Sequence, residues 1–316
     1  MSPNPRHSET SASGDSTLRD LKRAVVEFAR NASTEVSTHD EKLLEALAQR
    51  LPAGTPVYVA HTPKASLEDV VRVAIKIRSV GLTASPHIVA RRLPSEQALR
   101  DVLARLHEHG IDRILLVAGD LPRPIGPFNS TLEVIASGAL EQAQLRHLGV
   151  AGHPEGHPAV GPAGLLAALR AKQEFAARTG IAVHVVTQFG FNPAGVCAWD
   201  RMLTQEGIAL PVHVGIAGPA PLTKLLRFAV QCGVGTSIGS LVSNRGAVAS
   251  LTGLAAGPDE MLLGLVRGCA GHTGSRLVRL HVYSFGGALA TAGWLRAVGD
   301  GAFDLASDGR KFTVHS

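Results

Sequence analysis

Aromatic residues are scarce in this chain of 316 residues, at 4% of the total, although 45% of the residues are hydrophobic. The chain therefore has enough apolar content for a sizeable core, and that core must be mainly aliphatic. Cysteine is rare as well: Cys197, Cys232 and Cys269 are far apart and odd in number. They predict neither a disulfide framework nor a zinc knuckle, and we expect small core residues in a reducing compartment.

Long hydrophobic runs are missing too. No stretch of about 18 apolar residues is free of charge, which excludes a membrane-spanning helix. Residues 1–15 are polar, rich in serine and proline, and contain no apolar segment of a secretory signal. They predict a disordered polar tail and a cytoplasmic location.

Clustered charge is absent, although the formal net charge is +5 and the isoelectric point is about 9.4. The basic residues are scattered, with no run longer than a pair such as Arg91-Arg92, and no RNA-type aromatic cluster accompanies them. This pattern argues against a nucleic-acid partner and favours a small anionic ligand, phosphorylated or polycarboxylate.

Two common nucleotide-binding motifs do not occur. No GxGxxG follows the first apolar run, and no GxxxxGK[ST] loop is present. Their absence argues against a Rossmann domain and phosphoryl transfer.

What the sequence does contain is a series of short apolar runs with β-type composition. Most are apolar on both faces, which is typical of parallel strands buried between helices. The runs span 32–37, 56–61, 83–90, 113–120, 145–153, 182–189, 211–218 and 279–285.

Amphipathic segments with helix caps lie between these runs. Ser66 begins one that ends near Gly81, Ser95 begins another that ends at Gly110, and further segments cover 165–178 and 221–230. Eight strands alternating with helices predict a parallel (β/α)₈ TIM barrel over residues 16–316, with a doubly wound sheet as the alternative. Residues 244–269 predict a helical insertion between the last two strands.

In such barrels, the active site forms at the carboxyl ends of the strands. The polar residues there are Glu35, His61, His87, Asp120, His153, His157, Gln188 and Tyr283. A carboxylate inside a barrel strand is costly to bury without a task, which favours a functional Glu35 over a solvated edge carboxylate. Asp120 is either functional or a cap for its turn. His153 and His157 flank a rigid Pro/Gly loop and lack further ligands, so we expect no metal site.

Three fragments in this order resemble one family. GDLP at 119–122, PEGHP at 154–158 and TQFGF at 187–191 are similar to signatures of the methylenetetrahydrofolate reductase family, and the resemblance extends over about residues 30 to 290. It implies a (β/α)₈ barrel and the reduction of 5,10-methylenetetrahydrofolate to 5-methyltetrahydrofolate, a step of one-carbon metabolism and methionine biosynthesis. It also implies FAD as a hydride relay and NADH or NADPH as the donor.

The resemblance also implies roles for single residues. Glu35 matches the general acid that helps open the methylene bridge, and Asp120 matches an aspartate close to the flavin and the pterin. The positions that match the cofactor site are Ala60, His61, His87, Ala118, Asp120, His153, His157 and Lys172, and those that match the folate site are Gln188, Phe189, Leu222 and Tyr283.

Some of these positions depart from the family pattern. Ala118 stands where an arginine is common, Ala60 and His61 replace a threonine and a tyrosine, and His153 replaces a tyrosine. All four belong to the flavin shell, whereas Glu35, Asp120 and Gln188 are kept. Two alternatives therefore remain: a flavin-independent reductase with direct hydride transfer from NADH, and a non-catalytic folate-binding homologue. The partner is a small folate, and a homo-oligomer is compatible with the sequence.

Overall fold

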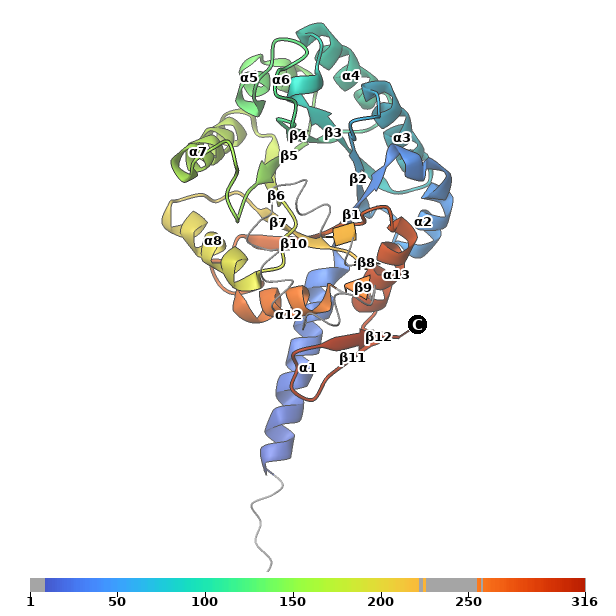
Figure 1. Ribbon diagram of the computed structural model, residues 1–316, viewed down its shortest axis with the longest axis vertical. Coiled ribbons are helices and arrows are strands. Elements are labelled where there is room, and N and C mark those ends of the chain that lie inside the picture. The colour runs from blue at the N-terminus through green and yellow to red at the C-terminus, as the bar shows by residue number, and fades with distance from the viewer. Residues whose placement is uncertain (1–8, 222–223, 226–254, 257, 316) are drawn as a thin grey trace, which may run out of the picture.

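The barrel predicted from the sequence is confirmed by a computed structural model, which describes residues 9–221, 224–225, 255–256 and 258–315. Eight parallel strands close into a barrel in the order β1-β10-β7-β6-β5-β4-β3-β2 (Figure 1). Each strand falls within or close to one of the apolar runs. The strands are β1 (Ser33–Ser37), β2 (Pro56–Ala60), β3 (Thr83–Val89), β4 (Arg113–Val117), β5 (His147–Gly152), β6 (Ala182–Thr187), β7 (Val212–Ala217) and β10 (Leu277–Tyr283).

Helices surround the barrel (Figure 1). Ser66 begins one of them as expected, because its hydroxyl accepts a hydrogen bond from the Asp69 amide while the Asp69 carboxylate accepts one from the Ser66 amide. The α-helices are α1 (Glu9–Arg30), α2 (Leu44–Arg50), α3 (Leu67–Ser79), α4 (Glu96–Glu108), α5 (Thr131–Ala136), α6 (Ala139–Gln142), α7 (Pro162–Thr179), α8 (Pro193–Gln205), α12 (Asp259–Gly268) and α13 (Ala288–Gly299). Short 3₁₀ helices are η1 (Thr38–Leu43) and η2 (Ala90–Arg92). Within the described part of the chain, no helix is both long and apolar enough to cross a membrane.

Two small antiparallel hairpins complete the structure. The first pairs β8 (Ala220–Pro221) with β9 (Ala255–Ala256), and the second pairs β11 (Phe303–Leu305) with β12 (Phe312–Val314). In the second hairpin, the rings of Phe303 and Phe312 lie 4.6 Å apart, and the Lys22 ammonium of α1 lies 4.8 Å from the Phe303 ring. This C-terminal hairpin therefore packs against the helix that precedes the barrel.

The N-terminal boundary differs from the prediction. Residues 9–15 were expected in a disordered tail, but α1 begins at Glu9 and its first part projects away from the barrel (Figure 1). These residues contain no proline, and extending an existing helix costs far less than starting one. Of the expected helical insertion at 244–269, the described residues include α12, and of the helix expected at 221–230 they include only Pro221, Lys224 and Leu225.

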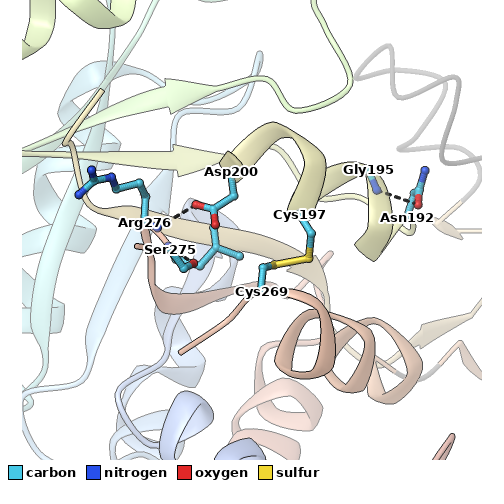
Figure 2. Close-up of a disulfide and its surroundings, with 8 residues drawn as sticks. Asn192, Gly195, Cys197, Asp200, Cys269, Ser275 and Arg276 are labelled. Atoms are coloured by element: carbon cyan, nitrogen blue, oxygen red, sulfur yellow. Dashed lines mark hydrogen bonds between the residues drawn. A yellow bond between two sulfur atoms is a disulfide. The ribbon is translucent and has the colours of Figure 1, made fainter. Parts of the chain in front are cut away.

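The expectation of three unpaired cysteines is wrong. Cys197 of α8 and Cys269, directly after α12, form a disulfide with their Cα atoms 5.5 Å apart (Figure 2). The two residues are 72 positions apart in sequence, and only the packing of α12 against α8 brings them together. A Cβ on Gly268 would lie 2.8 Å from the Cys197 sulfur, so glycine permits this approach. Cys232 lies outside the described residues.

The barrel interior is unusually polar. Tyr58 and His184 share a hydrogen bond of 2.9 Å between Oη and Nε2, and the His184 and His213 rings stack at 4.2 Å. The His281 ring lies 4.7 Å from the Tyr58 ring, and its Nδ1 is 2.9 Å from the Ser33 hydroxyl. Burial lowers the pKa of His184 and His281 to about 3, so these imidazoles are neutral at physiological pH.

Candidate functional site

Two cavities lie where the strands end. The first cavity, of about 600 Å³, is bordered by the ends of β1, β2, β6 and β10 and includes Glu35, Ala60, Gln188, Phe189 and Tyr283. The second cavity, of about 450 Å³, lies between β5, α7 and α8 and includes Ala118, Gly152, His153 and Lys172. The structure thus separates most of the residues expected at the substrate from several of those expected at the cofactor.

Among the described residues that line the first cavity, Glu35 alone carries a carboxyl group. Its side chain is 16% exposed, and burial raises its pKa to about 8, with a further increase from the nearby charge of Asp40. The closest approach of His87 is 3.8 Å, between its Nε2 and Oε2 of Glu35, and burial lowers the pKa of His87 to about 3. A neutral imidazole does not draw the proton from the carboxyl group, so Glu35 is an acid that keeps its proton at neutral pH.

Asp40 was not among the residues predicted for the site. It caps η1, because its Oδ2 accepts hydrogen bonds of 2.8 Å from both the amide and the hydroxyl of Ser37. These bonds fix a buried carboxylate close enough to Glu35 to disfavour a second negative charge there. The residue that caps η1 therefore also raises the pKa of Glu35, which lies two positions before the N-cap residue Ser37.

An aromatic wall formed by Phe189, Tyr283 and Phe285 faces the same cavity. The Phe189 ring lies 5.8 Å from Tyr283 and 4.9 Å from Phe285, and the Tyr283 hydroxyl donates a 2.8 Å hydrogen bond to the Thr187 carbonyl. Phe285 was not predicted, and its φ of 47° is unusual for a bulky residue. This turn holds the Phe285 ring beside the predicted rings of Phe189 and Tyr283. Together the three rings offer apolar faces to a planar ligand.

The second cavity contains a buried amine. Lys172 of α7 is 6% exposed, and burial alone lowers its pKa to about 8, with no compensating charge from the described residues. His153 lies at the same cavity, and burial, followed by His157 and Lys172, lowers its pKa to about 4. A buried ammonium group is stabilised by a bound anion, so this cavity suits a ligand with an apolar part and a phosphate.

Asp120 does not lie in either cavity. Its side chain is 71% exposed at the rim, where Oδ1 is 3.2 Å from Nη2 of Arg92. Arg92 also donates hydrogen bonds to the carbonyl groups of His61 and Thr62. The Asp120 turn needs Gly119, because φ is 91° there and a Cβ would lie 2.3 Å from Val89.

Two further predicted residues, His61 and His157, lie beside the cavities. His61 contacts the Ala65 carbonyl through Nε2 at 3.1 Å. His157 accepts a hydrogen bond from the Ala159 amide at Nδ1, and its ring is 4.9 Å from that of His153. Leu222 lies outside the described residues. Among the residues that the structure describes, no group of three or more His, Cys, Asp or Glu is arranged to hold a metal ion.

The comparison with known families agrees with the fold and with the sequence fragments. The family model described as methylenetetrahydrofolate reductase matches residues 29–244, which is more than half of the chain. The match begins just before β1 and includes Glu35, the Asp120 turn and Gln188. The chain therefore belongs to the methylenetetrahydrofolate reductase family and is an oxidoreductase.

Proposed function

We propose that the protein reduces 5,10-methylenetetrahydrofolate to 5-methyltetrahydrofolate with NAD(P)H and that Glu35 is the general acid. The observation that carries this proposal is the position of a carboxyl group with a pKa of about 8 in a cavity with an aromatic wall. A general acid must hold its proton at the working pH and lie beside the reacting atoms. The raised pKa of Glu35 and its position in the first cavity support this assignment.

The proposed chemistry assigns one proton transfer to Glu35. Protonation of nitrogen 10 by Glu35 breaks its bond to the methylene carbon and leaves an iminium group at nitrogen 5. A hydride then adds to that carbon and forms the methyl group. Gln188 hydrogen-bonds the pterin edge, and the rings of Phe189 and Tyr283 cover its faces and exclude water.

The charge of the second cavity supports a role in binding the expected FAD cofactor. Lys172 has an unbalanced positive charge for a phosphate, and His153 offers a neutral ring at the same cavity. When bound, FAD would accept a hydride from NAD(P)H and pass it to the folate. Asp120, which follows β4 and pairs with Arg92, would place its carboxylate near the reduced cofactor.

Direct hydride transfer from the nicotinamide to the folate is the second candidate. It is favoured by Ala118, which gives the second cavity a methyl group where the family commonly has an arginine. A visible absorption spectrum of the purified protein separates the two candidates. A flavin spectrum near one per chain supports the relay, and a protein that stays colourless with added FAD supports direct transfer.

The substitution Glu35→Gln tests the general acid. We expect folate turnover to fall by at least about 100-fold, because glutamine cannot donate the proton. If the relay operates, oxidation of NADH by an artificial acceptor should persist, which shows that the variant is folded. Folate turnover equal to that of the wild type would contradict the assignment of Glu35.

The expected cytoplasmic location and a possible homo-oligomer are also part of the proposal. Cell fractionation tests the location, and sedimentation tests the oligomeric state.

A further inference from the structure

At the amino end of the barrel, opposite the two cavities, four strands carry a basic residue near their start. These strands are β4, β5, β7 and β10, and each basic residue is among the first three of its strand. We call these residues the amino-end cluster: Arg113, His147, His213 and Arg279. They are far apart in sequence, so only the closure of the barrel brings them to one opening.

The side chains of His213 and Arg279 point into the barrel. The His213 ring stacks on that of His184, which shares its hydrogen bond with Tyr58 across the interior. Arg279 is the direct partner of His213 on the neighbouring strand. Side chains of directly paired residues in parallel strands lie on the same face, so Arg279 points inward as well. One guanidinium group therefore lies at the opening beside a buried imidazole.

The side chains of Arg113 and His147 share this direction. The two residues are direct partners, and His147 lies two positions before Gly149, the partner of His184. Because side chains alternate along a strand, both residues lie on the same face as His184. Burial lowers the pKa of His147, and the charges of Arg113 and Arg279 lower it further. Both guanidinium groups therefore act on one imidazole, as members of a single group around the opening.

The amino-end cluster has more positive than negative charge. Arg279 forms no ion pair with a carboxylate of the described residues, and burial and the charge of Arg113 both lower its pKa. Asp112 lies 3.8 Å from Nε of Arg113 through Oδ1 and 3.6 Å from Nε of Arg146 through Oδ2. Both distances are longer than a hydrogen bond. Within the described chain, one carboxylate thus stands against three guanidinium groups.

Two buried nitrogen atoms of the cluster have no hydrogen-bond partner among the residues that the structure describes. They are Nε of Arg113 and Nδ1 of His213, whose side chain belongs to a residue only 9% exposed. Buried polar atoms of folded proteins almost always bind a protein group, a water molecule or an ion. An oxyanion has acceptor oxygens for such N–H groups and a charge that balances the arginines. The same ligand therefore satisfies both observations.

We infer that the amino-end cluster binds a small oxyanion, such as inorganic phosphate, at the end of the barrel opposite the two cavities. The guanidinium groups of Arg113 and Arg279 contribute charge and planar pairs of donors that match the oxygens of a phosphate group. The imidazole of His213 contributes a neutral donor. The bound anion offsets the repulsion between the arginines and so stabilises the folded barrel. This site is separate from the folate and cofactor cavities, and the inference does not rest on the proposed function.

The test measures the melting temperature in increasing inorganic phosphate, with sodium chloride added to keep the ionic strength constant. We expect a saturable rise in the wild type, because a ligand that binds only the folded protein stabilises it. The variant Arg113→Gln/Arg279→Gln should bind phosphate at least about 10-fold more weakly, since it lacks the charge-assisted hydrogen bonds. Its own melting transition shows that it is folded. The matched control is Arg72→Gln/Arg100→Gln, which removes two charges on α3 and α4.

A further variant separates this site from the second cavity. Lys172→Met removes the buried amine of that cavity and should keep the response to phosphate. A response lost in Lys172→Met but kept in the double arginine variant would assign the phosphate to the second cavity and overturn the inference. A wild-type melting temperature that does not change with phosphate at constant ionic strength would overturn it as well.

Glycerol 3-phosphate, used in place of inorganic phosphate, identifies the source of the phosphate group. Tighter binding of glycerol 3-phosphate would assign the site to the phosphate of a larger ligand, and equal or weaker binding would assign it to the free ion. Both results uphold the oxyanion site, provided that the double arginine variant loses them. None of these measurements depends on folate turnover, so the site and the proposed function can fail separately.

Discussion

At the residue scale, the environment of Glu35 determines the pH range in which it can donate a proton. Burial and the fixed carboxylate of Asp40 raise its pKa to about 8, so the acid form dominates below that pH. We expect the rate of folate reduction to fall about tenfold per pH unit above pH 8. The fall should begin at lower pH in Asp40→Asn, which keeps a hydrogen-bond acceptor for Ser37 but removes the charge. Single-turnover rates between pH 6 and 10 measure both profiles, and identical profiles would contradict the role of Asp40.

Lys172 is a second residue whose charge is maintained against burial. Its pKa of about 8 in the folded protein lies below the ordinary value of 10.5, so the folded state binds fewer protons than the unfolded state between these values. Stability therefore rises with pH across this range, and the charged amine is destabilising at neutral pH. We expect Lys172→Met to raise the melting temperature of the cofactor-free protein at pH 7 more than at pH 10.

The same substitution should weaken the binding of FAD by about 10-fold or more, because a charge-assisted hydrogen bond to phosphate is lost. Opposite effects on stability and on cofactor affinity distinguish a binding lysine from a structural one. Arg178→Gln, on the exposed face of α7, is a suitable control for the loss of one positive charge. A lower melting temperature of cofactor-free Lys172→Met at pH 7 would contradict this interpretation.

At the element scale, the disulfide joins α8 to the segment after α12 (Figure 2). Closing a loop between residues 72 positions apart restricts the unfolded chain, and we expect its loss to cost about 2–4 kcal/mol of unfolding free energy. Replacing both Cys197 and Cys269 by alanine, or adding a reductant to the wild type, should lower the melting temperature to a similar extent. Reductant should have no further effect on the double variant, and a wild-type melting temperature insensitive to reductant would argue against the bond in solution.

The strands were predictable from sequence because a buried parallel strand is apolar on both faces, and such runs as Ile114–Val117 are distinct in the chain. The position of Glu35 at the barrel mouth followed from the same reasoning. The disulfide did not, because it depends on how α8 and α12 pack against each other. The roles of Asp40 and Phe285 could not be predicted from sequence either. The effect of Asp40 depends on how close its carboxylate lies to Glu35, and the position of the Phe285 ring depends on the conformation of its turn.

At the scale of the whole molecule, buried neutral histidines fill much of the barrel interior. Burial lowers the pKa of His87, His184 and His281 to about 3, and it also lowers the pKa of His213. The unfolded chain binds protons at these side chains below about pH 6.5, whereas the folded chain does not. Stability is therefore retained above about pH 6.5 and is lost as the pH falls below it.

We expect the unfolding free energy to decrease by roughly 1 kcal/mol per pH unit for each such histidine below pH 6. Denaturant titrations at pH 7.5, 6 and 5 measure this dependence. The variant His281→Asn removes one group of the series and should show a smaller decrease than the wild type. A stability that does not change between pH 7.5 and 5 would mean that the interior histidines are not buried as described.

The disulfide also determines what a protease can do to this chain. Cys197 and Cys269 lie on either side of β7 and of everything that follows it up to α12. A single cut anywhere between them breaks the backbone but leaves one covalent molecule, so the nicked protein keeps its full mass on a non-reducing gel. Two fragments separate only after reduction. With the disulfide intact, a cut at this part of the chain therefore adds two new chain ends but does not release a fragment.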